Sequence, residues 1–180
     1  HKVGLDLLSQ AEHGADSEVL LVSDSAELIN DTELALQQWL KQLPRAETAQ
    51  QALSHSHALL VSHLYTAFEI ANRYASEHLI FQLDQDEQWV AKVQNAGSVF
   101  VGAWTPESLG DYCSGTNHVL PTSGWARSHS GLSLIDFMKR ITVQQATQAG
   151  LQQLGPVAEV LAATEGLDAH RLAVSYRLDK

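Results

Sequence analysis

Short runs of apolar residues alternate along the first 102 residues with longer stretches in which apolar side chains recur at helical spacing. The apolar runs have the length expected of buried strands, and they cover residues 19–22, 58–62, 79–83 and 97–102. The expected helices cover residues 5–13, 26–43, 46–53, 65–75 and 86–94. This alternation predicts an α/β domain with a largely parallel sheet and flanking helices.

The pattern changes after residue 102. Residues 103–131 are rich in Gly, Ser, Thr, Pro and Trp and show no periodicity. A polar connection of this length is uncommon unless it is functional, so we expect it to build a site. Beyond it, helices are predicted over residues 133–140, 143–154, 157–165 and 168–178. We therefore divide the chain into an α/β domain over residues 1–131 and a small C-terminal helical appendage over residues 132–180.

The composition and charge of the chain exclude several classes of protein and of binding site. The net charge is −10, from 11 basic and 21 acidic residues, so the surface would repel a nucleic acid. No apolar run approaches the roughly 20 residues that a membrane span needs. Cys113 is the only cysteine, which excludes a disulfide within the chain and a multi-thiolate zinc site, and fits a cytoplasmic protein. Met138 is the only methionine, and we expect the chain to be part of a longer protein.

Two pairs of residues could carry chemistry. Gln10 and His13 are three residues apart on the first expected helix, so both could reach one metal ion, although the spacing alone favours a polar helix face. Glu77 and His78 follow a helix, where a carboxylate beside an imidazole could do acid–base work. This second pair precedes a strand, whereas ligands of open α/β sheets bind beyond the carboxyl ends of strands. Its position alone favours a solvated helix cap.

The stretch from Gly110 to His118 holds an acid, a thiol, two hydroxyls, an amide and an imidazole between glycines. Turn chemistry accounts for the glycines and for Asn117, but not for Asp111 together with His118, so a functional site is favoured here. Cys113 is expected to be a small buried thiol, because nothing basic adjoins it. The remaining histidines are expected on the surface or in loops: His55, His57, His63 and His129.

Taken together, several segments resemble histidinol dehydrogenases, in the same order along the chain. The segment from Pro106 to Thr122 is the most specific of them, and the resemblance covers nearly all of the chain after Gly4. The segments are Asp6–Gly14, Asn72–Leu79, Gly97–Phe100, Pro106–Thr122 and Ala169–His170. The resemblance implies the carboxy-terminal part of a zinc-dependent enzyme that oxidises L-histidinol through L-histidinaldehyde to L-histidine with NAD, in the last steps of histidine biosynthesis.

The resemblance also implies roles for individual residues. The zinc ligands of the family fall on Gln10, His13, Asp111 and His170. Zinc sites that use N and O donors without thiolates are usually catalytic. His78 would remove the alcohol proton and Glu77 would activate the water that attacks the aldehyde. The substrate would be bound by the four metal ligands and His78, together with His118 and Glu165.

The family is a homodimer with shared active sites, so the resemblance implies that Glu165 and His170 complete the site of the neighbouring subunit. It also implies that the NAD-docking domain is missing here, which leaves an incomplete Rossmann-like fold. No Gly-x-Gly-x-x-Gly turn occurs in the chain, and no residues that bind NAD are identified. Two other classes remain as alternatives: a zinc hydrolase that uses Glu77 to activate water, and a non-catalytic dimerisation module.

Overall fold

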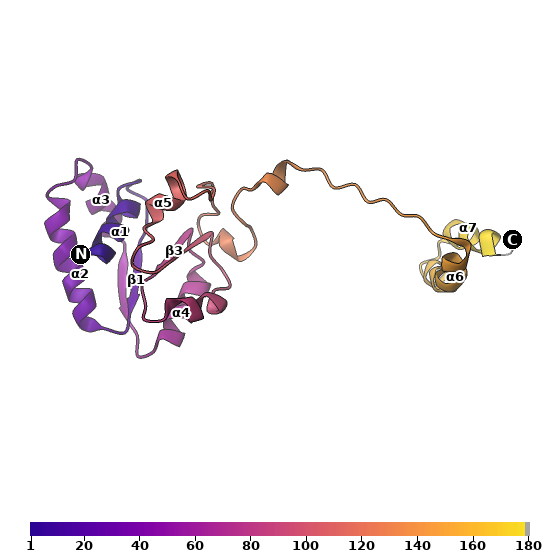
Figure 1. Cartoon of the computed structure of the whole chain (residues 1–180), viewed down its shortest axis with the longest axis horizontal. Helices are drawn as coiled ribbons and strands as arrows, with labels where there is room; N and C mark the ends of the chain where they lie inside the picture. Colours follow the sequence, from indigo (N-terminus) through magenta and orange to yellow (C-terminus); the bar gives the residue numbers. More distant parts are fainter. Residues whose placement is uncertain (179–180) are drawn as a thin grey trace. The chain divides into compact units, whose positions relative to one another are not determined.

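The computed structural model describes residues 1–178, which fall into two compact units, the first from His1 to Phe137 and the second beginning at Met138. The four strands and the first four α-helices of the first unit lie close to where the alternating pattern predicts them (Figure 1). Its strands are β1 (Leu20–Ser23), β2 (His57–Leu60), β3 (His78–Phe81) and β4 (Ser98–Val101). Its α-helices are α1 (Lys2–Ala11), α2 (Ala26–Leu40), α3 (Ala46–Leu53), α4 (Leu64–Tyr74) and α5 (Glu107–Tyr112).

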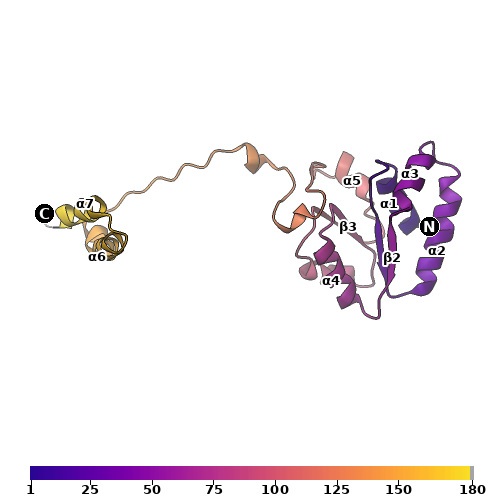
Figure 2. The same ribbon diagram turned by 180° about the vertical axis from the view of Figure 1, so that it is seen from behind.

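The four strands form two parallel pairs. β1 pairs with β2 in a register that places Leu20 opposite His57, and β3 pairs with β4 with His78 opposite Ser98. Each pair is a separate two-stranded sheet in the described part of the chain. Figures 1 and 2 both show α1, α2 and α3 beside β1 and β2, with α4 on the other side. The predicted α/β fold with parallel strands and flanking helices is therefore confirmed.

A small apolar core holds α1 in place. Leu8 and Ala11 of α1 are buried against Val19, just before β1, and against Ala49 and Ala52 of α3. α2 approaches α1 closely as well, since a Cβ on Gly4 would lie 3.2 Å from the Cβ of Ala35. Burying one such leucine stabilises the fold by about 1.5–3 kcal/mol. This packing fixes the helix whose last turn carries Gln10.

Three segments differ from the sequence predictions. Residues 86–94, expected as an α-helix, form the 3₁₀ helix η1 (Asp86–Lys92). The segment 103–131, expected to lack periodic structure, contains α5 and the short 3₁₀ helix η2 (Trp125–Arg127). Of the expected helix 133–140 only the 3₁₀ helix η3 (Leu134–Phe137) is present. No residue of η1 or η3 is buried, so these two segments lack the tertiary packing that stabilises most α-helices.

The second unit is a pair of packed helices, α6 (Gln148–Thr164) and α7 (Asp168–Leu178). Two helices were predicted over residues 143–154 and 157–165, whereas α6 is continuous, begins only at Gln148 and contains Pro156. A Cβ on Gly155 would approach Val174 and Leu178 to 3.2 and 3.0 Å, so α7 packs tightly on this point and supports the turn that contains the proline. No helix among residues 1–178 is both long and apolar enough to cross a membrane.

Candidate metal and acid–base site

The turn after α1 brings His13 to the site. α1 ends at Ala11, so the prediction that Gln10 and His13 share a helix is wrong for His13, which lies two residues beyond. Its N–H donates a hydrogen bond to the Gln10 carbonyl at 3.2 Å, and the Arg45 guanidinium donates to the His13 carbonyl at 3.1 Å. The turn is thereby fixed to the start of α3, and the His13 imidazole projects from it.

α5 brings two carboxylates to the same place. Glu107 and Asp111 are four residues apart on this helix, so both project from one face. Gly110 allows the helix to lie against β4, because a Cβ there would come within 2.6 Å of the Phe100 ring. Asp111, which was expected in a loop, is thus held on a helix that packs against the sheet.

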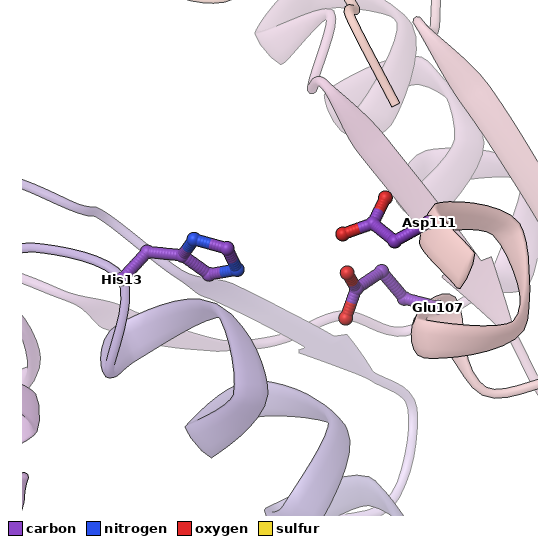
Figure 3. A group of neighbouring side chains, drawn as sticks. All are labelled: His13, Glu107 and Asp111. Carbon is purple, nitrogen blue, oxygen red and sulfur yellow. The ribbon is translucent and has the colours of Figure 1, made fainter. Parts of the chain in front are cut away.

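His13, Glu107 and Asp111 form one cluster. Their nearest ligand atoms all lie within 4.8 Å of one another, and Figure 3 shows the imidazole of His13 pointing toward both carboxylates. Glu107 is 3% exposed, and the Ser9 hydroxyl donates a hydrogen bond to its Oε2 at 3.0 Å. One imidazole and two carboxylates are N and O donors of the kind that bind zinc in catalytic sites.

Glu107 is the residue that the sequence predictions missed. It stands four residues before Asp111, a spacing that places two side chains on one helical face. The signal was present in the sequence, but it has meaning only once residues 107–112 are known to be helical. Without that helix Glu107 is one of many acidic residues.

His78 lies beside this cluster. Its Nε2 is 3.8 Å from Oδ1 of Asp111, and the two side chains are only 8% and 16% exposed. The ring also packs against Phe100, with centroids 5.8 Å apart. The interpretation of Glu77 and His78 as a solvated cap is therefore wrong for His78, because α4 ends at Tyr74 and the left-handed Ala75, with a φ of 55°, redirects the chain inward.

Several buried polar atoms at this site have no hydrogen-bond partner within residues 1–178. They are Nε2 of Gln10 and both imidazole nitrogens of His78. A buried polar atom without a partner costs roughly 1–3 kcal/mol, which a bound ligand would recover. Together with the donor set of His13, Glu107 and Asp111, these atoms fit a divalent metal and a polar substrate.

Burial raises the pKa of the Glu77 carboxyl above its ordinary value. The charges of His78 and then His13 oppose this rise, whereas those of Asp111 and Glu107 add to it. A carboxyl that keeps its proton to a higher pH than usual, next to an imidazole, is typical of acid–base sites.

The structure does not assign the remaining predicted site residues to this cluster. His118 is exposed in the segment after α5, and Glu165 and His170 belong to the second unit, where Glu165 follows α6 and His170 lies on α7. Cys113, expected to be buried, is an exposed free thiol, because the chain leaves helical geometry at this residue with a φ of −152°. His55, His57, His63 and His129 are exposed, as predicted.

The parallel α/β fold and the cluster of histidine and carboxylates define a class, that of α/β proteins with a site suited to a divalent metal. The family model of histidinol dehydrogenase matches residues 1–178, and the chain belongs to this family. A histidinol dehydrogenase of Xylella fastidiosa is 56% identical over 176 residues, and one of Mannheimia succiniciproducens is 53% identical over 178. These matches cover 98% and 99% of this chain but 41% and 42% of the relatives, so the chain spans about two fifths of their length.

A solved structure gives the same result. The crystal structure of histidinol dehydrogenase from Elizabethkingia anophelis superimposes on 99% of this chain and 41% of its own, with a TM-score of 0.96 and 46% sequence identity. At this identity the likeness extends beyond the fold to the family.

Proposed function

We propose that this chain is part of a zinc-dependent oxidoreductase that oxidises L-histidinol through L-histidinaldehyde to L-histidine with NAD. The observation that carries this proposal is the cluster of His13, Glu107 and Asp111 with the buried His78 beside it. The matched relatives are described as histidinol dehydrogenases, which supports the choice of substrate. The whole enzyme would act in the cytoplasm, in the last steps of histidine biosynthesis.

The metal would be held by Gln10, His13 and Asp111, with His170 as the fourth ligand. Gln10 would bind the metal through its side-chain oxygen. The nitrogen of the same amide is buried and has no hydrogen-bond partner within residues 1–178. Glu107 adds a carboxylate within reach of the same point. Bound zinc would supply positive charge and a fixed template for the imidazole and amine of histidinol.

In the first oxidation, His78 would accept the hydroxyl proton of histidinol. At the same time, the carbon that carries this hydroxyl would lose a hydride to NAD. Both of its ring nitrogens lack hydrogen-bond partners among residues 1–178, so the imidazole is available as a base. Asp111 lies 3.8 Å from Nε2 and would stabilise the imidazolium that forms. The products of this step are the aldehyde, reduced NAD and protonated His78.

In the second oxidation, Glu77 would take a proton from the water that attacks the aldehyde carbon, while protonated His78 returns its proton to the aldehyde oxygen. The resulting hydrate carries a hydrogen on that carbon, which leaves as hydride to a second NAD while His78 accepts a hydroxyl proton of the hydrate, and this yields the carboxylic acid. The charges of His78, His13 and Asp111 act on the Glu77 carboxyl, so both groups would serve one bound substrate. Carrying out both oxidations in one site would keep the reactive aldehyde from escaping.

We assign His118, Glu165 and His170 to substrate contacts, in addition to Gln10, His13, His78 and Asp111. Glu165 and His170 would reach the site of the partner in a homodimer. The exposed apolar side chains of α6 support an interface, since Leu154, Val157 and Val160 are 70%, 58% and 66% exposed. NAD would dock on the part of the enzyme that this chain does not contain.

The test uses a full-length protein in which this chain is joined to the remaining part of the Xylella fastidiosa relative. Incubation with L-histidinol should yield L-histidine and two molecules of reduced NAD per substrate, and removal of zinc with a chelator should stop the reaction. Hydrolysis of amide or ester substrates without reduction of NAD would contradict the proposal and favour a zinc hydrolase.

A further inference from the structure

Glu107 is a buried carboxylate without a positive partner. The residue is 3% exposed, and in the described part of the chain the Ser9 hydroxyl is its only hydrogen-bond donor, at 3.0 Å. Among residues 1–178, no lysine or arginine forms an ion pair with it. A carboxylate can accept about four hydrogen bonds, and buried charges in proteins are normally paired or bound to a metal. Glu107 therefore lacks the partner that its burial requires.

Other acidic groups lie around Glu107. A ligand oxygen of Asp111, one helical turn further along α5, lies within 4.8 Å of one of Glu107. Burial raises the pKa values of Asp6 and Glu77, and the charge of Glu107 adds to both rises. Like charges gathered in a buried place disfavour one another. A divalent cation bound at Glu107 would offset this repulsion.

Two histidines beside Glu107 favour the same cation. The His13 imidazole points toward Glu107 and Asp111, and the nearest ligand atoms of the three lie within 4.8 Å of one another (Figure 3). His78 is only 8% exposed, lies 3.8 Å from Asp111, and has no hydrogen-bond partner for either ring nitrogen among residues 1–178. Ligand atoms around a tetrahedral zinc ion lie about 3.4 Å apart, so side-chain movements of about 1 Å would close the cluster around an ion.

The donors of this cluster belong to one compact unit of a single chain. His13, Glu107 and Asp111 lie between His1 and Phe137, and so does Gln10. His170, the fourth ligand of the proposed function, lies on α7 in the second unit and would come from the neighbouring subunit. The first unit therefore offers four donors before that histidine arrives, and four is the usual coordination number of zinc.

We propose that Glu107 is a temporary ligand of the divalent ion and that His170 replaces it when two subunits associate. The other ligands of the ion would be Gln10, His13 and Asp111. The proposal rests on the proposed function, from which it takes the zinc and the role of His170. After the exchange, Glu107 would keep its hydrogen bond from Ser9 and remain as a negative charge beside the metal.

The exchange involves no proton or electron transfer. The bond between the metal and the Glu107 carboxylate breaks, and a neutral imidazole nitrogen of His170 forms the new bond. An anionic ligand is thereby replaced by a neutral one, which leaves the metal more positive and strengthens its attraction for the imidazole and amine of histidinol. The site would thus reach its full affinity for substrate only in the assembled enzyme.

The test is a double-mutant cycle of zinc affinity in the full-length protein made from residues 1–180 and the remaining part of the Xylella fastidiosa relative. Competition with a chelator gives the affinity of the parent, of Glu107→Gln, of His170→Ala and of the double variant. Glu107→Gln should reduce the affinity at least about tenfold more in the His170→Ala protein than in the parent, because only there is Glu107 the fourth ligand. Equal losses in the two backgrounds would overturn the proposal.

Cobalt(II) bound in place of zinc gives a second readout, because its visible absorption depends on its ligands. Glu107→Gln should leave the cobalt spectrum of the parent unchanged and should shift that of the His170→Ala protein. A shift in both backgrounds would show that Glu107 remains a ligand in the complete site. A shift in neither would show that it is never a ligand, and either result would overturn the proposal.

Three comparisons make the outcome specific. Glu33→Gln, on the exposed side of α2, should change neither affinity nor spectrum in either background. Glu107→Asp keeps the charge but shortens the side chain by one methylene, and it should also weaken zinc binding more in the His170→Ala protein, which provides a second variant if Glu107→Gln does not fold. A parent protein that binds no zinc would contradict the proposed function itself, whereas zinc binding with equal losses contradicts only the role of Glu107.

Discussion

Nε2 of His78 lies 3.8 Å from Oδ1 of Asp111, in a site where the two side chains are 8% and 16% exposed. His78 begins β3 and Asp111 lies on α5, so the sheet and the helix that packs on it set this distance. The separation is too long for a hydrogen bond but short enough for a strong electrostatic effect. The imidazole is thus kept near a carboxylate while its nitrogens remain available to a third group.

Single substitutions should separate the catalytic roles of Glu77 and His78 in the full-length enzyme. His78→Asn should slow both oxidations, because in each of them the imidazole would remove a hydroxyl proton from the carbon that loses the hydride. Glu77→Gln should reduce formation of NADH by roughly 10²-fold or more, the usual scale of help from a positioned acid or base, while zinc stays bound. The measurement is the rate of NADH formation from histidinol and, separately, from histidinaldehyde.

Glu69→Gln is the matched control, since Glu69 is exposed on α4 and should leave both rates unchanged. A Glu77→Gln enzyme that turns over at the rate of the parent would remove Glu77 from the mechanism.

Metal retention should depend on His13 and on Glu107 to different degrees. His13→Ala should abolish stoichiometric zinc, because a lost ligand opens the coordination shell. Glu107→Gln should weaken zinc binding by about 10–100-fold, the scale found for groups that support metal ligands. Zinc content by atomic absorption and affinity by competition with a chelator provide readouts that do not depend on activity.

Glu33, exposed on α2, provides the control Glu33→Gln, which should bind zinc like the parent. If His13→Ala retains its zinc, the assignment of ligands is wrong. If Glu107→Gln binds zinc as tightly as the parent, Glu107 has no part in holding the metal.

The sequence predicted well those elements whose ends carry strong local signals. α3 was predicted from Ala46 to Leu53, as observed, because Pro44 separates it from α2. At the start of α2, the Ser25 side chain accepts a hydrogen bond from the Leu28 N–H, a local cap that depends only on nearby residues. These helix boundaries depend on residues at the helix ends, and such local signals can be read directly from the sequence.

α5 could not be predicted in this way. It has six residues, one of them glycine, and such a segment is too short to show periodicity. Its packing against Phe100 is a tertiary contact between residues ten positions apart, so Glu107 escaped notice. The resemblance to histidinol dehydrogenases identified Asp111 without the helix, because it rests on a motif and not on local structure.

Gly110→Ala should destabilise the fold. The new Cβ would meet the Phe100 ring at 2.6 Å, so either α5 or the ring must shift, at a cost of about 1–3 kcal/mol. Ser108→Ala, on the exposed side of the same helix, should have little effect. Thermal unfolding of both variants checks this, and equal midpoints would show that α5 does not need the close approach.

The pKa of Tyr74 should respond to Glu18. Burial raises the pKa of the Tyr74 phenol, and the charge and hydrogen bonding of Glu18 raise it further. Because the folded protein favours the neutral phenol, its contribution to stability is complete below the ordinary pKa of tyrosine and is lost as pH rises through the raised value. Glu18→Gln should lower the pKa of Tyr74 only in part, since burial remains.

Absorbance titration of the phenolate, with Tyr74→Phe subtracted as background, measures this shift. An unchanged titration in Glu18→Gln would leave burial as the sole cause of the raised pKa.

The last prediction concerns assembly: His170 should ligate zinc in the neighbouring subunit. α6 exposes Leu154, Val157, Val160 and Leu161, and a two-helix unit buries such side chains better against a partner than alone. A pair related by a twofold axis would carry two equivalent sites, each completed by the other chain. Subunit exchange between full-length His13→Ala and His170→Ala should then place both lost ligands in one site and restore all four in the other. Activity should return to about half of the parent value per mixed dimer. No recovery despite demonstrated exchange would place His170 in the site of its own subunit.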